Sequence, residues 1–235
     1  MDEDTRRPRL RVVGGNQAIA TPRDRPYLNV TWVSRIMGGE ARCLWSAWFR
    51  GHNANYQLEE SAKDWSEWTA DHNEMVHREA EWLRRSGYVV TVEGLNNLKL
   101  EGQTGIVMSG TPDLIAVKDG TVRIEDCKTG QPRVAHRYQV MIYMAILPLV
   151  RPDLADFAIE GRLIYGEGIH KEIVHDDLDP VFKRDLFGLV RALGGAEPPP
   201  RAPSANECAF CTIAPNLCTD RVTDTDPVKV EHDLF

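Results

Sequence analysis

The chain has 235 residues, 42% of them apolar, and a formal net charge of -7, which suits one globular unit with a small appendage. The acidic balance argues against a generic polyanion-binding surface, although carboxylates in a metal site and in the tail account for much of it. The longest apolar run, 138–150, is too short and too polar to cross a bilayer, and the chain does not open like a secretory leader. We therefore expect a cytoplasmic protein without a membrane partner.

The N-terminal segment, residues 1–26, is rich in arginine and proline and is predicted to be a flexible basic arm. Contact of this arm with a phosphate backbone is the alternative interpretation. Residues 27–197 carry the periodic patterns of a folded core. Within them, residues 32–52 predict one or two helices broken near Gly38 and Gly39. A repeat of three and four residues then predicts a helix over 59–85.

Beyond Gly87 the period changes from helical to extended. Segments rich in β-branched residues, separated by glycine-containing turns, predict strands over 88–94, 98–102, 105–117 and 121–128. The Lys118-Asp119-Gly120 turn predicts a tight hairpin between the last two strands. Further along we expect a helix over 134–147, a strand pair within 158–174, a helix over 180–193, a proline-rich linker with a cysteine cluster over 198–218, and an acidic tail over 219–235.

Two carboxylates and a lysine interrupt the predicted hairpin at matched positions. Asp113 ends the sequence GTPD, and Asp126 and Lys128 follow on the next strand. Because side chains alternate along a strand, Asp126 and Lys128 are expected on one face, and Glu125 and Cys127 on the other. Carboxylates suit Mg²⁺ or Mn²⁺, which activate water and balance charge when a phosphodiester is cleaved. Singly these residues would indicate a turn and an exposed ion pair, but together they predict a catalytic site in which the lysine orients the water or helps deprotonate it.

Three further side chains are candidates for this site. Gln139 and Tyr143 lie four residues apart, hence on one face of the following helix, where they are suited to orienting the lysine and a DNA strand. The earlier long helix carries two histidines. His72 continues the apolar stripe and is interpreted as structural. His77 lies off the stripe, flanked by glutamates, where a neutral imidazole can reach a metal.

Three of the five cysteines cluster near the C-terminus. Cys208 and Cys211 form a CxxC pair, and Cys218 follows after six residues. In a cytoplasmic chain such a cluster favours metal ligation over a disulfide framework, and Cys43 would have to supply the fourth thiolate. All-sulfur sites hold zinc or an iron–sulfur cluster, and spacing alone does not separate the two. Cys127, by contrast, is predicted to be a small core residue.

The order of these motifs is familiar. A helical histidine, then GTPD, EDCK and QVMIY, with one cysteine upstream and three downstream, resembles the RecB-like branch of the PD-(D/E)xK nuclease superfamily. Within that branch the chain resembles the iron–sulfur, CRISPR-associated exonuclease type, and similar standalone nucleases are carried by bacteriophages. The resemblance runs from about Trp32 to Cys218. It implies a restriction-endonuclease-like α/β fold, with a four-stranded mixed sheet flanked by helices.

The resemblance also implies roles for individual residues. Mg²⁺ or Mn²⁺ would be held by His77, Asp113, Asp126 and the Cys127 carbonyl. Catalysis would rest on Asp113, Asp126 and Lys128 with the QxxxY pair Gln139 and Tyr143. A 4Fe-4S cluster would be held by Cys43, Cys208, Cys211 and Cys218, joining the N- and C-terminal segments.

The leading hypothesis is therefore a metal-dependent DNA exonuclease that acts at single-stranded or frayed ends. The sequence has no glycine-rich phosphate loop ending in Lys-Ser/Thr, so any unwinding would require a helicase partner. The alternative is a DNA-end-processing accessory subunit of a CRISPR adaptation or recombination complex, whose cleavage is gated by an integrase or recombination partner. A zinc-binding structural module is the third hypothesis.

Overall fold

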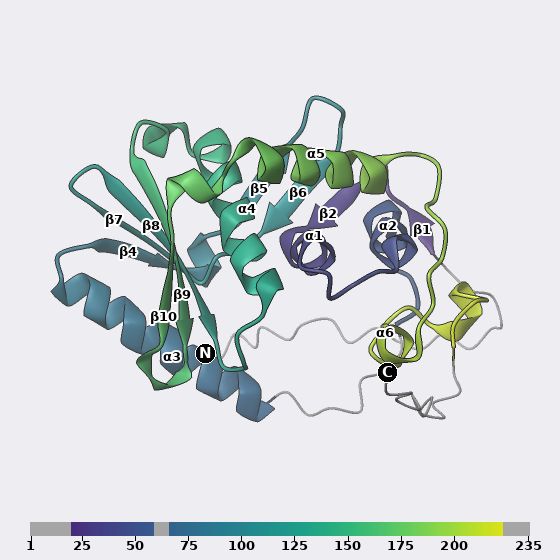
Figure 1. The fold of residues 1–235 in the computed structure, drawn as a ribbon, viewed down its shortest axis with the longest axis horizontal. Coiled ribbons are helices and arrows are strands. Elements are labelled where there is room, and N and C mark those ends of the chain that lie inside the picture. The colour runs from purple at the N-terminus through teal and green to yellow at the C-terminus, as the bar shows by residue number, and fades with distance from the viewer. Residues whose placement is uncertain (1–19, 59–65, 223–235) are drawn as a thin grey trace, which may run out of the picture.

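The computed structural model describes residues 20–58 and 66–222 (Figure 1). Most of the predicted basic arm and acidic tail, and the first residues of the predicted helix over 59–85, lie outside these ranges. The strands are β1 (Thr21–Pro22), β2 (Tyr27–Asn29), β3 (Asn53–Ala54), β4 (Val89–Val92), β5 (Leu98–Glu101), β6 (Val107–Gly110), β7 (Leu114–Lys118), β8 (Thr121–Lys128), β9 (Ala158–Tyr165) and β10 (His170–Ile173). The α-helices are α1 (Val30–Met37), α2 (Leu44–His52), α3 (Ser66–Arg85), α4 (Val134–Val150), α5 (Pro180–Gly194) and α6 (Ala205–Ala209). Short 3-10 turns include η1 (Glu93–Leu95) and η4 (His175–Asp177).

The main sheet has five strands in the order β10-β9-β8-β7-β4. β8 and β9 run parallel, and the other neighbours in this sheet are antiparallel. The predicted mixed sheet flanked by helices is thus confirmed, with five strands rather than four. The segment predicted as one strand over 105–117 is divided at Pro112. Its first half, β6, belongs to a separate sheet of order β2-β6-β5, because proline has no N–H to continue a ladder.

The predicted hairpin between β7 and β8 is confirmed. Lys118 pairs with Thr121, and the two turn residues between them, Asp119 and Gly120, have φ of 47° and 77°. Positive φ at both positions is typical of the two-residue turn that matches strand twist. The register pairs Leu114 with Glu125 at the open end of the hairpin. Asp113, the residue before β7, therefore lies beside the last residues of β8.

Helices cover both faces of the main sheet. α3 packs its buried residues against one face, made by Leu114, Ala116, Cys127 and Ile164. α4 packs on the opposite face and also on α1. The approach of α4 is close at β9, where a Cβ on Gly161 would lie 2.5 Å from the Val140 side chain and 2.6 Å from Met144. Only glycine therefore fits at this point of the sheet.

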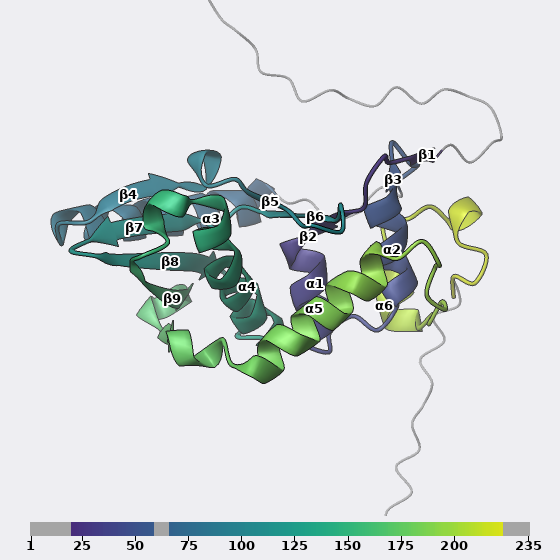
Figure 2. The same ribbon diagram turned by 90° about the horizontal axis from the view of Figure 1, so that it is seen from above.

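The N-terminal helices and the C-terminal segment form the other end of the molecule (Figure 2). α1 and α2 confirm the predicted helix pair, with Gly39 at a φ of 74° between them. α5 crosses over both helices and leads to α6, which lies far from the five-stranded sheet in both views (Figures 1 and 2). None of the described helices has the length and apolar character needed to span a membrane.

Candidate active site and cysteine pocket

The two predicted carboxylates meet at the open end of the β7–β8 hairpin. Asp113 immediately precedes β7 and is 7% exposed, and Asp126 on β8 is 1% exposed. One oxygen of Asp113 accepts a hydrogen bond of 2.7 Å from the backbone N–H of Cys127, which fixes this loop residue against the neighbouring strand. The alternation along β8 is as predicted, because Asp126 faces α4 whereas Cys127 packs among residues of α3.

A single hydrogen-bonded network joins Asp126 to α4. Gln139 donates through Nε2 to Asp126 Oδ1 at 3.1 Å and to the Tyr143 hydroxyl at 3.2 Å. Its Oε1 accepts from Lys128 Nζ at 3.2 Å, and the same ammonium group forms an ion pair with Asp126. Gln139 thereby uses its amide nitrogen and its carbonyl oxygen within the network. The structure brings the predicted residues Asp126, Lys128, Gln139 and Tyr143 together.

The electrostatics of this network favour added positive charge. Burial raises the pKa of Asp126 to about 6, and the nearby charge of Asp113 acts in the same direction. Burial by itself would lower the pKa of Lys128, but attraction to Asp126 and Asp113 outweighs it, so this pKa is raised. Asp126 Oδ2 is fully buried and accepts no hydrogen bond of ordinary geometry, although the Lys128 ammonium lies against it. A divalent cation fits such a carboxylate pair.

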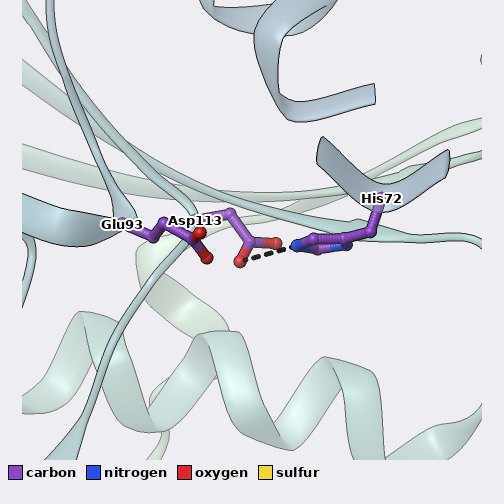
Figure 3. Close-up of side chains that lie close together, drawn as sticks. All are labelled: His72, Glu93 and Asp113. Atoms are coloured by element: carbon purple, nitrogen blue, oxygen red, sulfur yellow. Dashed lines mark ion pairs between the residues drawn. The ribbon is translucent and has the colours of Figure 1, made fainter. Parts of the chain in front are cut away.

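The histidine beside the carboxylates is His72, not His77. His72 Nε2 lies 3.5 Å from Asp113 Oδ1, and Glu93 in η1 completes a group whose ligand atoms lie within 4.8 Å of one another (Figure 3). The hydrogen bond to Asp113 raises the pKa of His72. His77 is exposed, because five residues along a helix rotate a side chain by about 140°. The structure thus places His72, which was interpreted from the sequence as structural, beside Asp113, whereas metal binding by His77 stays a prediction. Glu93 was not singled out from the sequence.

A buried ionic cluster attaches α3 to the sheet behind this site. Arg162 Nη1 on β9 donates to Glu79 of α3 at 3.4 Å and to Glu125 of β8 at 3.3 Å. Trp82 lies against the guanidinium group, 5.2 Å from it. Burial raises the pKa of Glu125 to about 7, and the charge of Glu79 adds to the effect. Because α3 carries His72, this cluster helps to set the position of that side chain over the sheet.

The four cysteines predicted as cluster ligands surround one cavity of about 360 Å³, lined by Cys43, Cys208, Cys211 and Cys218. Such a cavity is far larger than the roughly 15 Å³ that a single water needs. Arg50 donates through Nη2 to Cys211 Sγ at 3.7 Å, which suits a sulfur that carries negative charge. The Glu207 carboxylate accepts from the backbone N–H of Cys43 at 3.3 Å and joins the two chain segments. The four-thiol donor set and the room fit a metal cluster, whereas among the described residues the ligand atoms that converge as a single ion requires are those of His72, Glu93 and Asp113.

The fold and the paired carboxylates are those of a metal-dependent hydrolase. A family model described as the PD-(D/E)XK nuclease superfamily matches residues 28–218, and the chain belongs to this superfamily. Membership implies a nuclease that uses Mg²⁺ or Mn²⁺ and takes DNA as its substrate. A search of curated proteins gives no match. Among solved structures the chain is similar to one described as "Crystal structure of SSO0001", with 17% identity and a TM-score of 0.46 over 86% of this chain and 90% of that one.

Proposed function

We propose that this nuclease is a RecB-like DNA exonuclease that acts at single-stranded or frayed ends. The observation that carries the proposal is the network of Asp126, Lys128 and Gln139, set beside the buried Asp113 at the end of the β7–β8 hairpin. We assign the divalent-ion ligands to Asp113, Asp126 and His72, with the Cys127 carbonyl and Glu93 as further donors. An ion bound there supplies the positive charge that makes an attacking water nucleophilic near neutral pH.

The chain's own residues then orient the reacting groups. The Lys128 ammonium has three N–H donors, and its contacts with Asp126 and Gln139 leave one of them for the attacking water or a phosphate oxygen. Gln139 holds Lys128 and Asp126 at a fixed separation. The hydroxyl of Tyr143 accepts a hydrogen bond from Gln139 and so helps to fix the amide group, and Tyr143 itself is only 2% exposed. The predicted QxxxY pair thus serves to position the lysine and the carboxylate.

The site assignment is tested by cleavage of end-labelled linear DNA with Mg²⁺ or Mn²⁺. Asp126→Asn and Lys128→Met should each lower kcat at least about a hundredfold, since they remove a charged group that acts in the transition state. Lys183→Met, on the exposed surface of α5, is the matched lysine control and should keep wild-type activity. Wild-type cleavage by either site variant would refute the assignment.

The exonuclease assignment is tested separately with circular single strands. A protein that requires an end should degrade linear strands, labelled at either terminus, and spare the circular ones. Cleavage of the circles would indicate an endonuclease instead. No cleavage by the purified chain, followed by cleavage after addition of a helicase, recombination or CRISPR integrase partner, would favour the partner-gated accessory subunit.

We further propose that the cysteine pocket holds a 4Fe-4S cluster joining the segment that contains Cys43 to the segment over 198–218. The proposal is supported by four cysteines around one cavity and by the Arg50 N–H directed at Cys211. Anaerobic purification should yield a brown protein with iron and inorganic sulfide in equal amounts, and Cys43→Ser should lose most of both. A colourless protein that contains zinc would refute it.

A further inference from the structure

A histidine and a tyrosine that the sequence did not single out stand next to the catalytic lysine. In the parallel pairing of β8 with β9, Lys128 is the register partner of Tyr165, so their side chains project to the same face. His136 lies on α4 three residues before Gln139, hence on the helix face that meets this sheet. His136 Nδ1 and the Tyr165 hydroxyl are 3.2 Å apart, and their ring centroids are 5.9 Å apart.

The contact between the two rings favours one tautomer of His136. Tyr165 is 3% exposed, and its hydroxyl oxygen also accepts from the backbone of Arg133, which leaves the O–H to donate to His136 Nδ1. Burial is the main cause that lowers the pKa of His136 to about 4, and the charges of Lys128 and Arg133 act in the same direction. A neutral imidazole that accepts at Nδ1 carries its hydrogen on Nε2. His136 therefore offers an N–H donor from a half-buried ring.

The surroundings of this donor are basic in a chain whose net charge is -7. Lys128 and Arg133 both act electrostatically on His136, and Lys171 Nζ lies 5.8 Å from the centre of the Tyr165 ring. Arg133 is exposed and is paired only loosely with Glu40, at 3.6 Å. Cations grouped around a neutral donor beside the candidate active site favour an anionic group with several acceptor oxygens, such as a phosphate.

We propose that His136 Nε2–H donates a hydrogen bond to a non-bridging oxygen of a DNA backbone phosphate next to the scissile one. Tyr165 is the positioning residue that holds the imidazole in the required tautomer. The inference rests on the proposed nuclease function and extends it, because it assigns His136 and Tyr165 to the binding of the DNA strand beside Lys128. His136 is thereby a substrate-binding residue and not a metal ligand.

The first test compares variants of His136 on linear DNA. A hydrogen bond to a charged group corresponds to roughly a tenfold to hundredfold effect, so His136→Ala should lower kcat/KM by that factor, chiefly through KM. His136→Gln keeps an N–H donor near the position of Nε2 and should recover part of the loss. Tyr165→Phe keeps the ring and loses the hydroxyl, and should give a smaller loss. His175→Ala, an exposed histidine of η4, is the matched control and should match the wild type.

The second test locates the phosphate. A single neutral methylphosphonate is moved along the DNA strand, one linkage at a time. At the linkage that His136 contacts, the substitution should slow the wild type but add no further loss to His136→Ala, as expected for two changes that remove one interaction. Independent, multiplicative losses at every linkage would overturn the proposal, as would wild-type kcat/KM in His136→Ala.

Failure of the proposed function is distinguishable from failure of this inference. DNA binding is measured by fluorescence anisotropy with Ca²⁺ in place of Mg²⁺, so that no cleavage is needed. A wild type that binds DNA with Ca²⁺ but cleaves none with Mg²⁺ or Mn²⁺, either alone or with a helicase, recombination or CRISPR integrase partner, would refute the nuclease function. The same methylphosphonate scan, read as affinity, would still decide the role of His136. Circular dichroism on each variant shows whether it is folded. If His136→Ala is not folded, the kinetics of Tyr165→Phe and His136→Gln decide the role of His136.

Discussion

The buried carboxylate of Glu125 should make the protein less stable at alkaline pH than at acid pH, and Glu125→Gln should remove that loss. Glu125 is fully buried, and burial raises its pKa from 4.5 to about 7. A carboxyl whose pKa is raised on folding binds its proton more tightly in the folded protein. Its contribution is therefore fully present below pH 4.5 and is lost as the pH rises through about 7.

The magnitude follows from the size of this shift. A change from 4.5 to about 7, at about 1.4 kcal/mol per pKa unit, makes the loss about 3 kcal/mol at pH 8. The glutamine side chain of the Glu125→Gln variant would be neutral at every pH and would keep an oxygen to accept from Arg162. Arg162 also keeps its ion pairs with Glu79, at 3.4 Å, and with Glu172, at 3.2 Å. We therefore expect the variant to exceed the wild type by about 1–3 kcal/mol at pH 8 and to be close to it near pH 5.

The assay is urea unfolding at pH 5 and pH 8, followed by tryptophan fluorescence, with EDTA present so that no divalent ion is bound. Both proteins share every other titrating group, so the change in their difference between the two pH values reports the Glu125 carboxyl together with its charge coupling to Glu79. Glu160→Gln on β9 is the matched control. Its side chain is 44% exposed and pairs with Arg123, so its effect should stay below about 1 kcal/mol at both pH values. A difference for Glu125→Gln that does not grow between pH 5 and pH 8 would refute the reasoning.

Two further predictions concern the position of the site residues. Gly110→Ala places a Cβ 2.7 Å from Tyr143 Cε1 and 2.9 Å from Val30, so it should lower the free energy of unfolding by about 1–3 kcal/mol in urea titrations; an unchanged midpoint would contradict this packing. His72→Ala should weaken Mn²⁺ binding in calorimetry about tenfold or more, while His77→Ala should bind like the wild type, and the reverse order would favour His77 as the ligand.

Local patterns predicted the hairpin and the network well. Asp119-Gly120 fixes a two-residue turn, the turn fixes the register, and the register places Asp126 and Lys128 on the face that meets α4. Gln139 and Tyr143 could then be placed by helical spacing alone. These relations depend on residues close in sequence, so period and turn chemistry are sufficient to predict them.

The choice between His72 and His77 could not be made in this way. Both lie on one helix, and which of them meets Asp113 depends on how α3 is rotated against the sheet. That rotation is set by tertiary contacts, including the pair of Glu79 with Arg162 across 83 residues of sequence. Glu93 was missed for a different reason: it is an exposed residue of the short turn η1, and no periodic pattern marks it in the sequence. Tyr165 enters the site only through the parallel pairing of β8 with β9.

The cysteine pocket has a consequence for the order of events during synthesis. Cys43 leaves the ribosome before any strand of the main sheet has been made, and Cys218 leaves after all of them. The cavity that they share with Cys208 and Cys211 can close only after the carboxylates and the lysine of the hairpin have been synthesised. A cofactor that needs all four thiolates can therefore be bound only after the whole nuclease core has been synthesised, and its retention reports a core of full length.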